Sequence, residues 1–159
     1  MENNTEKQFL EEFVKIVVDS HNAVIIESGG ESGIRDEGGL YNSCYKIISF
    51  SRKHNKSPFL TAAFIYSEFA KRHYFVDGNK RTAHVLAKAF LILEGYHFLT
   101  PYKTAVNFII NIAKDNISIN KTKKWLEENS IEIDKTDIKL YIKRTIEELH
   151  DTYDRKRKK

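Results

Sequence analysis

The distribution of glycine and proline is the feature that most limits the folds open to this chain. The 159 residues include seven glycines and two prolines, and five of the glycines lie between Gly29 and Gly39. Long stretches without these helix breakers favour helices over many short strands. The glycine-rich segment cannot hold a stable regular element, so we expect a movable loop there. The sequence therefore predicts an all-α, single-domain helical bundle with one such loop.

Helix start signals and apolar spacing locate the expected helices. Thr5 and Gln8 have the spacing of a capping box at the start of a first helix. Asp36 is a candidate N-cap for a second helix. Ser57 followed by Pro58 is typical of the start of a third. Apolar residues at helical spacing predict the remaining helices over about 79–94 and 102–114, around Trp125, and from about 134 onward.

Composition and charge limit the expected cellular location of the protein and the classes of partner that it binds. Cys44 is the single cysteine, which rules out an internal disulfide and favours a reducing, cytoplasmic location. No apolar run approaches the roughly 20 residues that span a bilayer, and the polar N-terminus does not resemble a signal peptide, so no membrane association is expected. The net charge is +4, with much of the excess in Arg155–Lys159. A basic tail is usually solvated, so we do not expect nucleic acid as the main partner.

The segment from His73 to Arg81 combines residues suited to phosphate chemistry at the predicted start of a helix. Backbone N–H groups in the first turn of a helix lack carbonyl partners and lie at the positive end of the helix dipole, which makes an anion site. Lys80 and Arg81 are unfavourable in that turn unless an anion is bound. Gly78 allows left-handed backbone angles, and Asn79 can hold the turn by bonding to nearby backbone.

Two further side chains in this segment are candidates for catalysis. Asp77 offers a hard oxygen ligand beside the expected phosphates, as Mg²⁺ normally requires. His73 is the nearby residue of the type that exchanges a proton near neutral pH, and it is the candidate general base for an attacking hydroxyl. Each residue alone has an ordinary structural explanation. Their combination within nine residues predicts a phosphate site.

At these residues the chain resembles the Fic/Doc (Fido) family. The sequence HYFVDGNKR matches every specified position of the family signature HxFx(D/E)GN(G/K)R. The GGxxGxRDEGxL segment before it and the WLEEN segment near Trp125 resemble the death-on-curing (Doc) branch. The resemblance covers roughly residues 5–130. It implies a Fido domain over 1–130, mainly helical and with a short flap loop or hairpin, followed by a C-terminal helical extension with a basic tail over 131–159.

The resemblance also implies a function and a set of roles. Family members transfer AMP or phosphate from a nucleoside triphosphate, here ATP with Mg²⁺, to a Ser, Thr or Tyr hydroxyl of a protein. The implied roles are catalytic base for His73, Mg²⁺ ligand for Asp77, phosphate binding for Gly78, Asn79, Lys80 and Arg81, and alignment of the target by a flap around Arg35 and Asp36.

Two positions bear on which reaction the chain performs. AMP-transferring members usually carry glycine where this chain has Lys80, and the death-on-curing toxin has lysine, which favours phosphoryl transfer. The same toxin commonly has alanine where this chain has Gly78, so AMP transfer remains the alternative. A non-enzymatic helical module that binds nucleic acid through Lys80, Arg81 and the basic tail is the second alternative.

The resemblance further implies partners. The target would be a translation factor, such as an elongation factor. The chain has no match to the inhibitory Ser/Thr-x-x-x-Glu-Gly/Asn pattern of many family members, so control is expected from outside. Death-on-curing toxins pair with a small antitoxin whose disordered tail folds into a groove on the toxin. An exposed apolar groove would support such a cognate antitoxin here.

Overall fold

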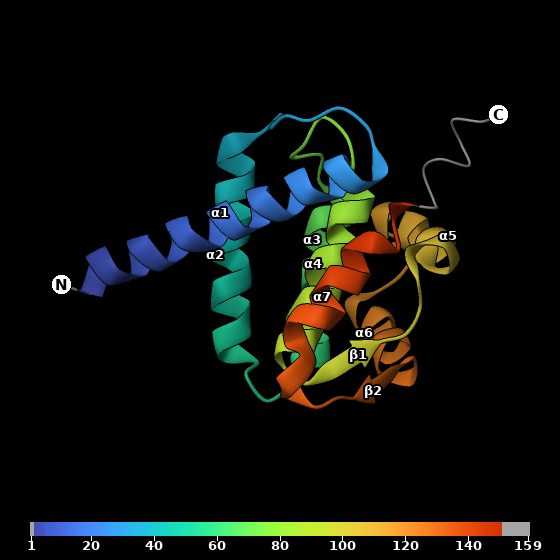
Figure 1. The fold of residues 1–159 in the computed structure, drawn as a ribbon. Coiled ribbons are helices and arrows are strands. Elements are labelled where there is room, and N and C mark those ends of the chain that lie inside the picture. The colour runs from blue at the N-terminus through green and yellow to red at the C-terminus, as the bar shows by residue number, and fades with distance from the viewer. Residues whose placement is uncertain (1, 151–159) are drawn as a thin grey trace.

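The computed structural model describes residues 2–150, and these form an all-α domain with one small sheet (Figure 1). The helices are α1 (Glu2–Ser28), α2 (Glu37–Lys53), α3 (Pro58–Lys71), α4 (Asn79–Leu93), α5 (Tyr102–Ala113), α6 (Ile119–Glu128) and α7 (Ile138–Glu147). The strands are β1 (Tyr96–Phe98) and β2 (Ser130–Glu132), and a 3-10 turn spans Lys135–Asp137. The predicted fold class is confirmed.

Helices α3 and α4 form the centre of the bundle. They pack on each other, and the remaining helices surround them: α5 and α6 pack on α3, α1 and α7 pack on α4, and α2 packs on α1 and α3 (Figure 1). Small side chains on α3, among them Ala62, Ala63 and Ala70, are fully buried and allow close helix packing. Large side chains such as Tyr66 and Phe69 fill the space between. The loop between α3 and α4 is therefore attached to the most buried part of the domain.

The helix start signals are confirmed in part. The Asp36 carboxylate accepts a hydrogen bond from the Gly39 N–H at 2.8 Å, so Asp36 is the N-cap of α2 as predicted. Pro58 is the first residue of α3, although the Ser57 side chain makes no capping bond. The capping box predicted at Thr5 is wrong, because α1 already begins at Glu2 and Thr5 lies inside it. A long helix thus extends beyond its local start signal.

The small sheet was not predicted from the sequence. Strands β1 and β2 pair antiparallel, with Tyr96 opposite Glu132 and Phe98 opposite Ser130. Each has only three residues, too few for an alternating pattern to be recognised. The glycine-rich flap also does not form a hairpin of its own. Ile34 instead makes an isolated antiparallel bridge to Phe75 in the loop before α4.

The C-terminal helix packs against the domain. Helix α7 contacts α4 and α1, and Leu149 just beyond it is fully buried beside Val24 and Val85. The buried ammonium of Lys88 on α4 lies 3.4 Å from the carboxylate of Glu148. The basic tail Arg155–Lys159 lies outside the described residues. Within residues 2–150, no helix is both long and apolar enough to cross a membrane.

Candidate functional site

The loop from Arg72 to Gly78 joins the two central helices, and Asn79 fixes its shape. The Asn79 side chain accepts a hydrogen bond from the Phe75 N–H at 3.0 Å and donates one to the Phe75 C=O at 2.9 Å. Gly78 is the N-cap of α4 with φ of 76°, a left-handed conformation that favours glycine. Its C=O accepts the N–H of Thr82 at 2.9 Å. The predicted turn at the N-terminus of α4 is therefore present.

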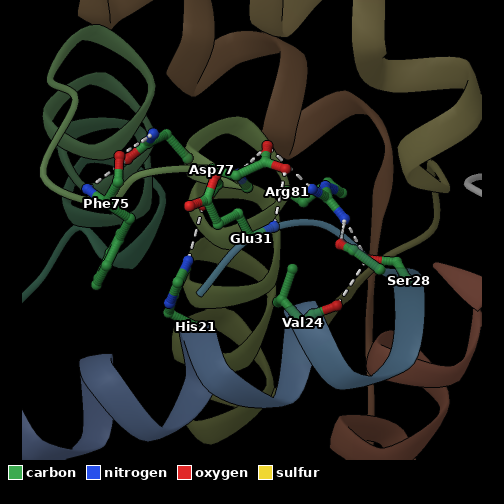
Figure 2. Close-up of polar contacts among 10 residues, drawn as sticks. His21, Val24, Ser28, Glu31, Phe75, Asp77 and Arg81 are labelled. Atoms are coloured by element: carbon green, nitrogen blue, oxygen red, sulfur yellow. Dashed lines mark hydrogen bonds and ion pairs between the residues drawn. The ribbon is translucent and has the colours of Figure 1, made fainter. Parts of the chain in front are cut away.

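His21 of α1 supports this loop from below (Figure 2). Its imidazole is 1% exposed and stacks on Phe75 with ring centroids 3.8 Å apart. Its Nε2–H donates to the Asp77 C=O at 2.8 Å. Burial lowers the pKa of His21, partly offset by that bond, so the neutral form is favoured. Sequence reasoning missed His21, although a histidine on the apolar stripe between Val17 and Val24 was a detectable signal.

Arg81 reaches from α4 to the C-terminal end of α1 (Figure 2). Its Nη1 donates to the Ser28 hydroxyl at 2.5 Å and to the Gly29 C=O at 2.7 Å. Its Nη2 lies 3.3 Å from Oδ1 of Asp77, one helical turn away. The Arg81 side chain is only 9% exposed. The end of α1, where helix carbonyls concentrate partial negative charge, therefore holds this cation beside the loop.

The Asp77 carboxylate lies beside Arg81 and is partly open to solvent. Its Oδ1 accepts from the Gly78 N–H at 2.6 Å, whereas Oδ2 has a longer contact of 3.3 Å with the Glu31 N–H (Figure 2). The side chain is 44% exposed. Gly30, with φ of 111°, passes so close that an added Cβ would overlap Oδ2 of Asp77. The flap therefore borders the carboxylate directly.

The donor set around Asp77 fits a metal shared with a substrate. Among the described residues, no group of three or more His, Cys, Asp or Glu side chains could hold a metal ion alone. A half-exposed carboxylate with one weakly engaged oxygen fits Mg²⁺, which often uses one or two protein carboxylates together with phosphate oxygens and water. Asp77 is therefore the residue that could hold such an ion.

His73 and Lys80 are the two predicted residues of this segment whose side chains have no polar partner among the described residues. His73 is exposed, two residues beyond the end of α3. Within residues 2–150, its imidazole has no hydrogen bond or ion pair, so both ring nitrogens are available. Lys80, half-buried in the first turn of α4, likewise forms no ion pair with any described residue. Both side chains are able to meet a bound ligand.

The two predicted flap residues have different positions. The Asp36 carboxylate is used as the N-cap of α2. Arg35 is exposed, and its N–H donates to the Tyr74 C=O at 2.7 Å. The Val76 N–H donates to the Gly33 C=O at 3.0 Å. The flap therefore lies against the segment that follows His73, although Asp36 has a structural use there.

This fold and this turn define the class: a mainly helical domain whose two central helices are joined by a loop that Asn79 orders and that leads into α4 at Gly78. The model of the Fic/DOC family matches residues 14–91, from the middle of α1 to the end of α4, and the chain belongs to that family. Members of the family transfer nucleotide-derived groups to proteins. No curated protein matches the chain.

Proposed function

We propose that this protein transfers the γ-phosphoryl group of ATP to a Ser or Thr hydroxyl of a target protein. The observation that carries the proposal is the single fixed loop that holds Asp77, the turn at Gly78 and Asn79, and Arg81 together, with His73 five residues before the turn. The expected target is a translation factor, as in death-on-curing toxins, which this chain resembles. ATP and such a target would both be met in the cytoplasm.

The proposed reaction assigns one step to each group. The target hydroxyl gives its proton to His73 while its oxygen forms a bond to the γ-phosphorus. The bond between that phosphorus and the oxygen bridging to the β-phosphate breaks, and ADP leaves. The N-terminus of α4 and the guanidinium of Arg81 hold phosphate oxygens by charge-assisted hydrogen bonds. Asp77 would hold Mg²⁺, which neutralises charge on the phosphates when bound.

Lys80 favours phosphoryl transfer over AMP transfer. In the described residues this cation is not paired with a carboxylate, so it can bind a phosphate group without first breaking an ion pair. AMP-transferring relatives usually have glycine at this place. Gly78, which resembles those relatives, keeps transfer of AMP as the alternative.

The position of a radiolabel distinguishes the reactions. The purified protein would be incubated with cell extract, Mg²⁺ and ATP labelled on either the α- or the γ-phosphate, with His73→Ala and Asp77→Asn proteins as controls. We expect a labelled protein band from γ-label alone, and none with either control. A band from α-label alone would indicate AMP transfer. No band from either label would favour the non-enzymatic alternative, which predicts salt-sensitive duplex binding.

An apolar groove supports the second part of the proposal, a cognate antitoxin. Helices α1 to α4 line a groove of about 530 Å³ whose walls are almost entirely apolar. Phe9, Ile16 and Leu93 border it, and each is about half exposed. The ion pair between Glu6 and Arg52, 3.3 Å apart, lies at the same groove. An amphipathic helix formed by the tail of an antitoxin is the occupant that we propose.

The antitoxin proposal has its own test. A small protein captured from the source cells would qualify only if it gains helical circular dichroism on binding and stops His73-dependent transfer. We expect Leu93→Glu to abolish capture while leaving the transfer reaction intact, because a charge in the groove opposes an apolar partner face. Lys124→Glu on the exposed side of α6 is the matched surface control. Equal capture by Leu93→Glu and wild-type protein would contradict the groove as the docking site.

A further inference from the structure

Tyr74 follows His73 directly and makes contacts that the transfer chemistry does not use. Its side chain is buried, and its ring packs edge-on against Phe69 of α3 with centroids 5.8 Å apart. Its hydroxyl forms a hydrogen bond with the Ser43 hydroxyl of α2. Ser43 in turn donates to Oε2 of Glu68 on α3 at 2.5 Å. A chain of two hydrogen bonds therefore joins the loop to two helices.

The two hydrogen bonds that link Tyr74, Ser43 and Glu68 have the same donor direction, from Tyr74 toward Glu68. The Glu68 carboxylate can only accept, so the single hydroxyl hydrogen of Ser43 is used in the bond to Glu68. The oxygen of Ser43 must then accept the hydrogen of the Tyr74 hydroxyl. Burial raises the pKa of Tyr74, and the nearby Glu68 charge acts in the same direction. The phenol therefore keeps the proton that this bond needs.

The main chain of Tyr74 holds the flap. Its C=O accepts hydrogen bonds from the N–H of Arg35 at 2.7 Å and from the N–H of Asp36 at 3.1 Å. The bridge between Ile34 and Phe75 continues the same pairing. The residue whose phenol is fixed by α2 and α3 is thus the residue whose carbonyl fixes the flap.

We propose that Tyr74 is a positioning residue that sets the place of the flap relative to His73, with Ser43 and Glu68 holding its phenol. This inference rests on the proposed function and on the role expected for the flap around Arg35 and Asp36, which is to align the target hydroxyl with His73. Without the bond to Ser43 the Tyr74 residue is less firmly anchored, so its main chain can shift, and with it the carbonyl that Arg35 and Asp36 use.

The phosphate part of the site is held by other contacts. His21 bonds to the Asp77 carbonyl, and Ser28 bonds to the Arg81 guanidinium, both from α1. Neither contact involves Tyr74, and the flap meets this part of the site through Gly29 and Glu31, not through Arg35 and Asp36. Loss of the Tyr74 hydroxyl should therefore impair use of the protein target and leave nucleotide binding unchanged.

Steady-state kinetics test this separation. Tyr74→Phe should raise the KM for the protein target by roughly 5- to 10-fold, the effect of one lost hydrogen bond, and leave the KM for ATP unchanged. Ser43→Ala should do the same, and the double variant should be no worse than either single variant, because all three lack the bond between Tyr74 and Ser43 that holds the phenol. Equal rises in both KM values, or additive effects, would overturn the proposal.

Variants of Glu68 and Cys44 distinguish a positioning role of Tyr74 from a general loss of packing around it. Glu68→Gln keeps an acceptor for Ser43 and should retain nearly wild-type kinetics, whereas Glu68→Ala should resemble Ser43→Ala. Cys44→Ala removes a buried side chain next to Ser43 without touching the chain of bonds, and it should leave the KM for the target unchanged. A Cys44→Ala protein as impaired as Tyr74→Phe would overturn the proposal.

Amide hydrogen exchange provides a readout that needs no substrate. The N–H groups of Arg35 and Asp36 should exchange faster in Tyr74→Phe than in wild-type protein, and at the wild-type rate in Cys44→Ala. Unchanged exchange in Tyr74→Phe would overturn the positioning role. If exchange responds as expected but the wild-type protein transfers no label, the proposed function fails and the link between Tyr74 and the flap stands.

Discussion

The guanidinium of Arg81 donates a hydrogen bond to the hydroxyl of Ser28, 2.5 Å away and 53 residues earlier in the chain. Ser28 itself donates to the Val24 C=O at 2.6 Å, so its oxygen is oriented to accept from Arg81. The end of α1 thereby fixes the direction of the buried Arg81 side chain at the start of α4. Helix α1 is consequently part of the proposed site although it contributes no residue to the family signature.

Ser28→Ala should weaken binding of ATP with Mg²⁺. The variant removes the acceptor that orients Arg81, and we expect a loss of about 5- to 10-fold in affinity, the worth of roughly 1 kcal/mol. Ser20→Ala is the matched control, because Ser20 makes the same bond to its own helix, to the Ile16 C=O at 2.7 Å, on an exposed surface. Isothermal titration with the nucleotide measures both. Identical affinities for the two variants would remove Ser28 from the site.

Gly30→Ala should disturb the flap and the Asp77 carboxylate together. An added Cβ would overlap Oδ2 of Asp77 and would lie 3.1 Å from Nη2 of Arg81, at a backbone φ of 111° that alanine rarely adopts. We expect a loss of about 1–3 kcal/mol in unfolding free energy and weaker nucleotide binding. Gly38 is a residue of α2, and a Cβ added there would meet no other atom. Gly38→Ala should therefore leave the unfolding free energy unchanged or raise it slightly. Urea denaturation of both variants measures the change in unfolding free energy. An unchanged value for Gly30→Ala would show that the flap can move to accommodate the added Cβ.

His84 should make the fold sensitive to acid. It is fully buried, with the Tyr66 hydroxyl bonded to Nδ1, and burial lowers its pKa well below the ordinary value, with Lys88 acting in the same direction. The unfolded chain takes up a proton near pH 6.5 and the folded chain does so only at lower pH, so stability is present above about pH 6.5 and is lost as the pH falls. Between the pKa values of the folded and unfolded states, His84 lowers the free energy of unfolding by about 1.4 kcal/mol for each unit by which the pH falls.

The variant His84→Asn, which keeps a polar group near the Nδ1 position, tests this dependence. Denaturation curves between pH 5 and 8 should show a shallower acid slope for the variant than for wild-type protein. Above about pH 7.5, where histidine is neutral in both states, the stability difference between the two proteins should be constant. An unchanged acid slope would mean that other groups cause the acid sensitivity.

Glu148→Gln should destabilise the domain more than Glu147→Gln. Glu148 pairs with the buried Lys88, and burial already lowers the pKa of that lysine, so losing the carboxylate leaves the ammonium without its counter-charge. Because Glu148 is partly exposed, we expect about 1–2 kcal/mol. Glu147 pairs with exposed Lys143 at 3.7 Å, which is worth less than about 0.5 kcal/mol. Equal effects in chemical denaturation would contradict a structural role for the buried pair.

The elements with local signals could be predicted from the sequence. Pro58 at the first position of α3, the Asp36 cap and the turn at Gly78 and Asn79 depend on neighbours within a few residues, and all are present. The loop expected over the glycine-rich segment is present only over residues 29–36, because Gly38 and Gly39 lie in the first turn of α2, which Asp36 caps. The roles assigned to His73, Asp77, Lys80 and Arg81 stay predictions, although the structure places Asp77 and Arg81 in contact.

The contacts that complete the site could not be predicted, because they join distant segments. His21 lies 56 residues from its partner Asp77, and Ser43 lies 31 residues from Tyr74. No periodicity or motif specifies which residues meet across such separations. For His21, the sequence could have indicated that a partner exists, because a histidine on the buried face of a helix requires a hydrogen-bond partner, but it could not identify Asp77 as that partner. The three-residue strands gave no signal at all.

Comparison of turnover and nucleotide affinity in His73→Ala tests the central claim most directly. The exposed His73 side chain has no hydrogen bond, ion pair or ring contact with any described residue, so the variant should fold as the wild type does. We predict that label transfer to the target falls by about 10²- to 10⁴-fold while the affinity for ATP with Mg²⁺ stays nearly unchanged. A variant that binds ATP poorly but transfers label at the wild-type rate once saturated would contradict His73 as the base.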